Sequence, residues 1–122
     1  MIRYRMLNLN PLNEIENDCV CRAISLGLDE NYYKIQEKIE LIGQLFECDS
    51  LCVCCYQHLL DNVYGLERIK GFKGMTVNQF ASYNYRGAYL VRVDGHLTCV
   101  IDGKIYDTWD CGNEIVDIIW AC

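Results

Sequence analysis

The sequence predicts an α+β domain in which N-terminal helices pack on a C-terminal antiparallel sheet. Between residues 19 and 63, apolar side chains recur at helical spacing. From residue 87 onward they follow short extended segments instead. Helices followed by strands, rather than alternating with them, are typical of this class. The chain has 122 residues, and we expect it to form one domain over 1–122.

Composition excludes several classes of function. With 52% hydrophobic and 23% charged residues, the chain is expected to form a compact globule. The net charge is −6 and no basic stripe is present, so nucleic acid is not an expected partner. No segment approaches the roughly 18 apolar residues of a membrane span, and the N-terminus lacks the apolar core of a signal peptide. We therefore expect a cytoplasmic protein without a membrane partner.

The helices and strands have recognisable boundary signals. Asn17 or Asp18 is expected to cap the first helix, and Gly27 to end it. Thr76 and Gln79 have the spacing of a capping box. The expected elements are a strand at 2–7, a polar loop at 8–16, helices at 19–26, from 30 to 42 and at 50–63, a strand at 66–72, a short helix at 76–82, and strands at 88–93, 96–101, 104–109 and 115–120.

An Asp-Gly dipeptide at 102–103 lies between two extended segments and predicts a two-residue hairpin turn. With that turn, Thr98 lies opposite Asp107 and His96 opposite Trp109. All four side chains then share one face of the hairpin. His96 and Asp107 become diagonal neighbours within hydrogen-bonding reach. Asp110 would lie on the opposite face of the hairpin, away from His96.

Cys19 is the expected first residue of the first helix, where the helix dipole favours a thiolate. A carboxylate beside an imidazole orients the ring and stabilises its protonated form. We therefore predict Cys19 as nucleophile, His96 as general base and Asp107 as the group that orients His96. Cys21 lies about 200° further around the helix and should face the core. The alternative for Cys19 is a packing role in the first turn.

This arrangement resembles that of the papain-like cysteine peptidases: a cysteine after Asp18 at a helix start, a distant histidine on a strand, and an aspartate on the next strand. The resemblance implies a papain-like fold and an upstream Gln or Asn that donates to the oxyanion. Asn13, six positions before Cys19, has the spacing seen in bacteriocin-processing peptidases, although those usually carry Gln. Asn17 is the alternative donor. Asp18 and Trp109 are expected on the substrate side of the site.

A second resemblance covers nearly the whole chain. The motifs are Tyr4-Arg5 through Pro11, DCVCRAI at 18–24, Thr76-Val77, and HLTCVIDGKIYDTWDCGNEIVDIIW at 96–120. They are similar to those of a family of small phage and prophage proteins. This resemblance implies a papain-like fold and a location in the cytosol of a bacterial host.

Two functions remain open from the sequence. One is a cysteine peptidase or amidohydrolase that cleaves a peptide, isopeptide or amide bond, without a cofactor, in a substrate such as a host protein. The other is a catalytically silent papain-like protein that binds a host defence protein or a small signalling molecule. Fold alone does not distinguish them.

The chain has nine cysteines, an odd number without a secretion signal, so free thiols in a reducing compartment are expected. Cys48, Cys52, Cys54 and Cys55, with His58, suggest a zinc site. A second, distant pair of ligands is missing, however, and one helix rarely surrounds an ion with four ligands. We therefore expect these thiols to pack in the core and no metal to bind. His58 is expected on the helix surface or half-buried.

Overall fold

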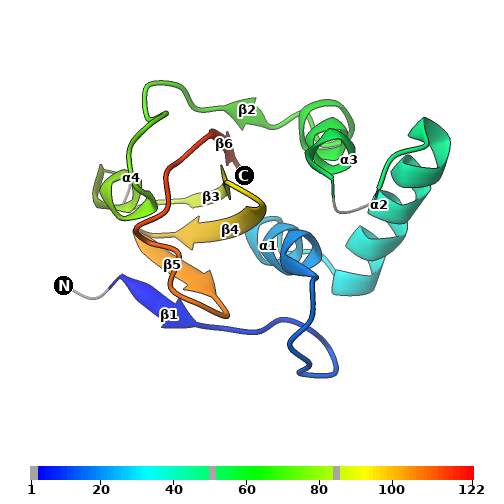
Figure 1. The fold of residues 1–122 in the computed structure, drawn as a ribbon, viewed down its shortest axis with the longest axis horizontal. Coiled ribbons are helices and arrows are strands. Elements are labelled where there is room, and N and C mark those ends of the chain that lie inside the picture. Colours follow the sequence, from blue (N-terminus) through cyan, green and yellow to red (C-terminus); the bar gives the residue numbers. More distant parts are fainter. Residues whose placement is uncertain (1–2, 50–51, 84–85) are drawn as a thin grey trace.

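A computed structural model describes residues 3–49, 52–83 and 86–122. Helices and a sheet pack together, which confirms the α+β class. The elements are β1 (Tyr4–Met6), α1 (Cys19–Gly27), α2 (Tyr32–Phe46), α3 (Val53–His58), a π-helical turn η1 (Leu59–Val63), β2 (Glu67–Arg68), α4 (Val77–Tyr83), β3 (Ala88–Val93), β4 (His96–Ile101), β5 (Lys104–Asp107) and β6 (Ile118–Ala121). Figure 1 shows their arrangement.

One sheet contains six strands in the order β1-β5-β4-β3-β6-β2. The pairing is antiparallel except between β1 and β5, which run parallel. In Figure 1, the first strand (blue) therefore lies beside the strand that carries Asp107 (orange). The two segments are far apart in the sequence. As the edge strand, β1 covers the side of β5 next to the predicted site.

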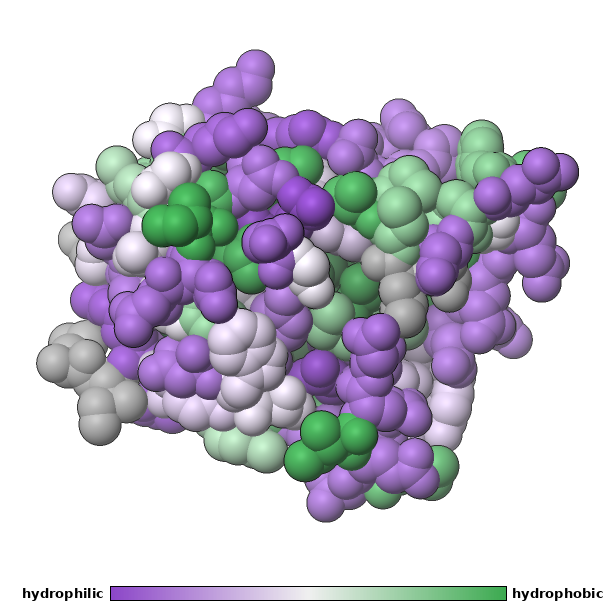
Figure 2. Space-filling model, viewed as in Figure 1, coloured by the Kyte–Doolittle hydropathy of each residue, from purple (hydrophilic) through white to green (hydrophobic). Residues whose placement is uncertain are grey.

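Each face of the sheet has its own core, because successive residues of a strand point to opposite faces. Leu90, Cys99 and Trp120 join the core under α1, α2 and α3. Their neighbours Val91 and Val100 join the second core, which includes α4. Figure 2 shows mostly hydrophilic residues on one face of the molecule, with scattered hydrophobic ones. None of the described helices is both long and apolar enough to cross a bilayer.

The hairpin register is as predicted. Ile101 pairs with Lys104, and Cys99 with Tyr106. The turn residues Asp102 and Gly103 have positive φ angles of 50° and 75°, which an Asp-Gly turn accommodates. However, β5 ends at Asp107 rather than at 109. The Asp107 carboxylate accepts a hydrogen bond from the backbone N–H of the next residue at 2.7 Å, which turns the chain away from the sheet.

The helix boundaries follow the predictions closely, with local differences. Helix α1 begins at Cys19 and α2 extends to Phe46, beyond the predicted end at 42. The predicted third helix is divided into α3 and η1, and its expected start at residue 50 lies outside the described residues. The predicted strand at 66–72 is paired only over the two residues of β2. The capping box is confirmed, since Gln79 N–H donates to Thr76 Oγ1 and Thr76 N–H to Gln79 Oε1.

The cysteines depart from the expectation that all thiols are free. Cys48 and Cys55 form a disulfide, with Cα atoms 6.7 Å apart. Glu47 ends α2 in the left-handed conformation, with φ 53°, so the chain turns back and brings Cys48 to the next helix. Helical spacing within the sequence does not reveal this turn. The free cysteines of the described chain are Cys19, Cys21, Cys52, Cys54, Cys99, Cys111 and Cys122.

Candidate active site

The structure brings together the three side chains for which the sequence predicts catalytic roles. Cys19 is the first residue of α1, His96 begins β4 and Asp107 ends β5. Helix α1 packs against β4, and β4 pairs with β5. Cys19 and His96 border a pocket of about 80 Å³ whose walls also include Val53, Tyr56, Arg92 and Gly95. The nucleophile candidate is therefore reachable from solvent beside the imidazole.

His96 and Asp107 form the strongest contact of the site. His96 Nε2 lies 2.6 Å from Asp107 Oδ2, and the two side chains are only 9% and 3% exposed. Burial raises the pKa of the Asp107 carboxyl, but the hydrogen bond from His96, the charge of His96 and the backbone N–H of Thr108 lower it by more, so the direction of the shift favours the charged carboxylate. Burial lowers the pKa of His96, and hydrogen bonds to Asp107, Cys111 and Cys19 more than reverse this effect. The directions of both pKa shifts favour an aspartate paired with an imidazolium.

Cys19 borders the same pocket as His96, and the imidazole lowers the pKa of the Cys19 thiol. Burial raises the pKa of the Cys19 thiol. The His96 hydrogen bond, the Leu97 backbone N–H and the charges of His96 and Arg22 lower it by more, so the pKa falls below the ordinary value. Cys21, two residues along the same helix, is buried in the core, and burial raises its pKa to about 12. The two neighbouring thiols therefore differ strongly in expected reactivity.

Arg22 is a part of the site that we did not predict from the sequence. Its Nη1 lies 3.2 Å from Asp107 Oδ1, and its Nε lies 2.6 Å from Asp18 Oδ1. One guanidinium thus connects the residue before Cys19 with the carboxylate that orients His96. The i, i+4 spacing of Asp18 and Arg22 indicates their ion pair. The contact with Asp107 links residues from opposite ends of the chain, and no local pattern indicates it.

Asp18 does not lie where a substrate-binding residue was expected. It is 6% exposed, and its second oxygen accepts hydrogen bonds from Tyr32 Oη at 2.8 Å and from Asn10 Nδ2 at 3.0 Å. Its carboxylate is therefore engaged within the protein. It also does not hydrogen-bond the free N–H groups of α1, although it is the N-cap residue. The contacts instead hold the loop before α1 against the helix, which makes Asp18 a positioning residue.

The two predicted oxyanion donors are both exposed and lie in the loop before α1. Asn13 has a left-handed backbone, with φ 54°. Neither Asn13 nor Asn17 is among the described residues that line the pocket beside Cys19. The buried amide of this loop is Asn10, which binds Asp18 and accepts the backbone N–H of Leu12 at 2.9 Å. Sequence reasoning missed Asn10 because its role depends on the folded shape of the loop.

Trp109 and Cys111 flank the imidazole. The Trp109 ring is 4.9 Å from the His96 ring, between centroids, and remains 43% exposed. It therefore covers one side of His96 at the surface, on the same side of the hairpin as predicted. Cys111 is buried, with its sulfur 3.7 Å from Asp107 Oδ2. Asp110 accepts a hydrogen bond from the Gly112 backbone instead of approaching His96.

No family model, curated protein or solved structure matches this chain. The chemistry of the site therefore has to be argued from its own geometry. A thiol with a lowered pKa at a helix start, beside an imidazole that is bound to a buried carboxylate, provides the components of nucleophilic acyl transfer. Besides these three residues, Arg22 and Asn10 determine how the site is held.

Proposed function

We propose that this protein is a papain-like cysteine hydrolase that cleaves a peptide, isopeptide or amide bond. The observation that carries the proposal is the position of Cys19 beside His96 in one pocket, with His96 bound to the Asp107 carboxylate at 2.6 Å. A thiolate and imidazolium formed before substrate arrives would supply both the nucleophile and the acid that the reaction requires. Asp107 would act on His96 and would not contact the substrate.

In the proposed mechanism, Cys19 Sγ attacks the substrate carbonyl carbon and forms a tetrahedral oxyanion. His96 donates its proton to the leaving nitrogen as the C–N bond breaks, which releases an amine and leaves a thioester on Cys19. Neutral His96 then accepts a proton from water, whose oxygen attacks the thioester. Collapse of the second tetrahedral intermediate releases the carboxylic acid and returns the thiolate and imidazolium.

The oxyanion needs hydrogen-bond donors near Cys19. The backbone N–H of Cys19 itself, in the first turn of α1, has no partner within the helix and can serve as one donor. Asn13 or Asn17 would have to move toward the pocket to add a side-chain donor, because both are exposed outside its lining. We therefore assign the main contribution to the helix backbone, with either Asn as a second donor after the loop moves.

The proposed substrate is an extended or terminal segment of a protein. A pocket of about 80 Å³ accommodates little more than one small side chain, so most of the substrate would lie on the surface. The exposed Trp109 ring beside His96 offers an apolar contact for that segment. The proposed setting is the cytosol of a bacterial host during phage infection, where a host protein would be the substrate.

Alkylation with iodoacetamide under mildly acidic conditions tests the site directly. An ordinary thiol has a pKa of about 8.5 and is mostly protonated there, whereas a thiolate paired with imidazolium reacts. Mass spectrometry should find Cys19 labelled and Cys21 unlabelled. His96→Ala should slow Cys19 labelling on the order of tenfold or more, and the matched variant His58→Ala should leave it unchanged. Equal, slow labelling of all exposed thiols would reject the proposal.

A second candidate is a catalytically silent protein that uses the same pocket for binding. The small pocket and the outward position of Asn13 and Asn17 favour it. The partner would be a host defence protein or a small signalling molecule. A Cys19→Ala variant distinguishes the two candidates. Full biological effect of this variant would support binding, whereas loss of the effect together with capture of an uncleaved protein would support hydrolysis.

A further inference from the structure

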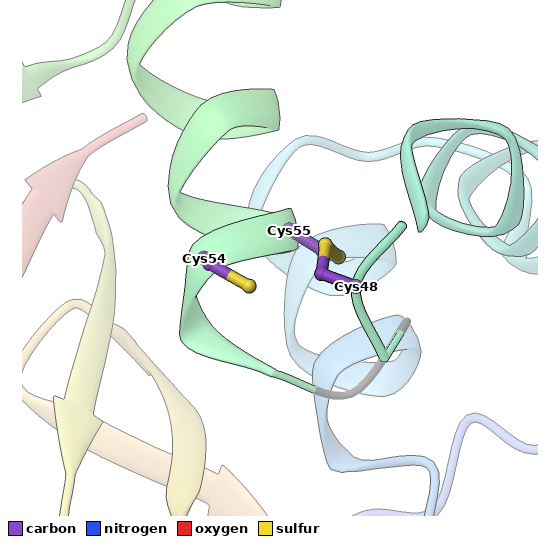
Figure 3. A group of neighbouring side chains, drawn as sticks. All are labelled: Cys48, Cys54 and Cys55. Carbon is purple, nitrogen blue, oxygen red and sulfur yellow. A yellow bond between two sulfur atoms is a disulfide. The ribbon is translucent and has the colours of Figure 1, made fainter. Parts of the chain in front are cut away.

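Four cysteines gather where the chain passes from α2 to α3. The sulfur atoms of Cys48, Cys54 and Cys55 all lie within 4.8 Å of one another. Figure 3 shows that they come from two segments: Cys48 from the loop after α2, and the other two from the first turn of α3. The Cys54 sulfur points toward the disulfide of the other two. The sulfurs therefore converge from different backbone directions, which a single helix would not allow.

A fourth cysteine lies nearby along the chain. Cys52 is the N-cap residue of α3, two residues before Cys54, and both residues are exposed. Cys55 is buried, and Cys48 is half-buried. The cluster thus has one sulfur anchored in the core and two at the surface. An ion arriving from solvent could reach it without unfolding the helices.

We propose that these cysteines form a thiolate site for a soft divalent metal ion of the zinc class when the disulfide is reduced. Cys48, Cys54 and Cys55 supply three ligands, and Cys52 supplies the fourth. Zn–S bonds of about 2.3 Å in a tetrahedron place the sulfurs roughly 3.8 Å apart, which is within the 4.8 Å that the sulfurs of Cys48, Cys54 and Cys55 already span. Thiolates select zinc-class ions over magnesium or calcium, which prefer oxygen ligands.

The metal-bound state has two more electrons, one more metal ion and two fewer protons than the disulfide state. A dithiol reductant transfers two electrons and two protons to the Cys48–Cys55 bond, giving two thiols and its own cyclic disulfide. Binding of Zn²⁺ then displaces a proton from each of the four thiols. In the reverse direction, a disulfide oxidant accepts two electrons from Cys48 and Cys55, forms their S–S bond, and leaves too few thiolates to hold the ion.

The metal site is independent of the proposed hydrolase, since no ligand is shared with Cys19, His96 or Asp107. The two regions nevertheless touch, because Val53 and Tyr56 flank the cysteines in the sequence and line the pocket beside Cys19. A second group, formed by His96, Asp107 and Cys111, also has ligand atoms within 4.8 Å. Its histidine and carboxylate are already bound to each other at 2.6 Å, so we assign the metal to the cysteine cluster.

Cobalt titration of the full chain tests the proposal. The protein is reduced with a phosphine, freed of reductant under anaerobic conditions and titrated with Co²⁺ as a spectroscopic substitute for Zn²⁺. We expect one ion per chain, with thiolate-to-cobalt charge-transfer absorption and the visible bands of a tetrahedral site. Zn²⁺ should displace the cobalt and abolish the spectrum. Protein that keeps its disulfide should show neither band.

Two variants locate the ion. Cys54→Ser removes an exposed ligand without disturbing the core, and should weaken metal binding at least tenfold and reduce the charge-transfer absorption. Cys111→Ser should leave both unchanged. Binding that is lost in Cys111→Ser but retained in Cys54→Ser would place the metal beside His96 and overturn the proposal. Reduced protein that binds no cobalt through sulfur would also overturn it, and the four cysteines would then be a structural disulfide with two free thiols.

Discussion

At the scale of single residues, Arg22 has the most consequential contacts in the site. Its side chain is 10% exposed and binds two carboxylates that are themselves almost fully buried, Asp18 and Asp107. Each carboxylate would be costly to bury without a cation beside it. The same guanidinium also lowers the pKa of Cys19 through its charge. Arg22 therefore affects both the stability of the fold and the state of the proposed nucleophile.

Replacing Arg22 with methionine should destabilise the protein strongly. The change preserves helix propensity but leaves the buried Asp18 carboxylate without a cation and Asp107 with His96 alone, and removing one partner of a buried pair costs about 3–5 kcal/mol. Urea unfolding followed by circular dichroism measures the loss. Lys73→Met is the matched control, because Lys73 is 80% exposed in its ion pair with Asp117 and should contribute less than about 1 kcal/mol. Equal losses in the free energy of unfolding would show that the Arg22 ion pairs stabilise the fold no more than the exposed Lys73 ion pair does.

The pH dependence of Cys19 alkylation is also determined by individual residues, Cys19 and His96. The pKa of Cys19 is lowered and that of His96 is raised, so the ion pair exists between the two values. The labelling rate should therefore fall at a lower pH than that of an ordinary thiol, at the point where acid protonates the thiolate. Asp107→Asn removes the charge that holds the proton on His96, and should shift the acid limb to higher pH. An unshifted profile would contradict the role assigned to Asp107.

At the scale of elements, the hairpin of β4 and β5 sets the geometry of the site. A two-residue turn aligns His96 and Asp107 on one face, and a shift of one residue would separate them. This part of the site was predictable, because Asp-Gly and the alternating flanks are local signals. The end of β5 at Asp107 was not predictable, because it depends on the hydrogen bonds that the Asp107 side chain makes in the folded protein. The π-helical turn η1, which divides the predicted third helix, was also not predictable from local signals.

The turn itself can be tested. Gly103 has a φ angle of 75°, in the left-handed region that disfavours a Cβ atom. Gly103→Ala should cost about 1–2 kcal/mol, measured as the change in the free energy of unfolding. Asp102→Asn is the matched control at the neighbouring position, since Asn tolerates its φ angle of 50°. A neutral Gly103→Ala would mean that the hairpin is held by strand pairing alone.

At the scale of the whole molecule, the site joins both ends of the chain. Cys19 and Arg22 come from the first helix, whereas His96 and Asp107 come from strands near the C-terminus. The fold class and the face shared by His96 and Asp107 followed from sequence periodicity. The contacts of Arg22 and Asn10 and the Cys48–Cys55 pairing did not, because each joins segments whose distance depends on tertiary packing. Periodicity reports which face a residue occupies, but not what lies opposite it.

Stability as a function of pH is expected to reflect the buried pair. The pKa of Asp107 is lowered in the folded state, so its contribution is present above the unfolded value of about 3.9 and is lost as pH falls. The pKa of His96 is raised, so its contribution is full below the unfolded value of about 6.5 and declines as pH rises. The destabilisation by Asp107→Asn should therefore be largest between about pH 4 and 6.5.

Unfolding by urea at a series of pH values measures this window. Asp110→Asn is the control, because Asp110 is exposed and bonds to the backbone of Gly112 rather than to His96. Its effect on the free energy of unfolding should be small and should not vary with pH. A destabilisation by Asp107→Asn that keeps the same size below pH 4 and above pH 6.5 would mean that His96 and Asp107 are not an ion pair in solution.

The parallel pairing of β1 with β5 affects how the protein matures on the ribosome. Tyr4 and Met6 lie beside Ile105 and Asp107, and Leu7 donates its N–H to the Asp107 carbonyl at 2.9 Å. During synthesis the first strand and the thiol-bearing helix emerge long before their partners, and domains generally fold as units. A nascent chain therefore carries Cys19 as an ordinary thiol without its imidazole. The thiol can meet its imidazole and carboxylate only after β4 and β5 have been synthesised and have paired.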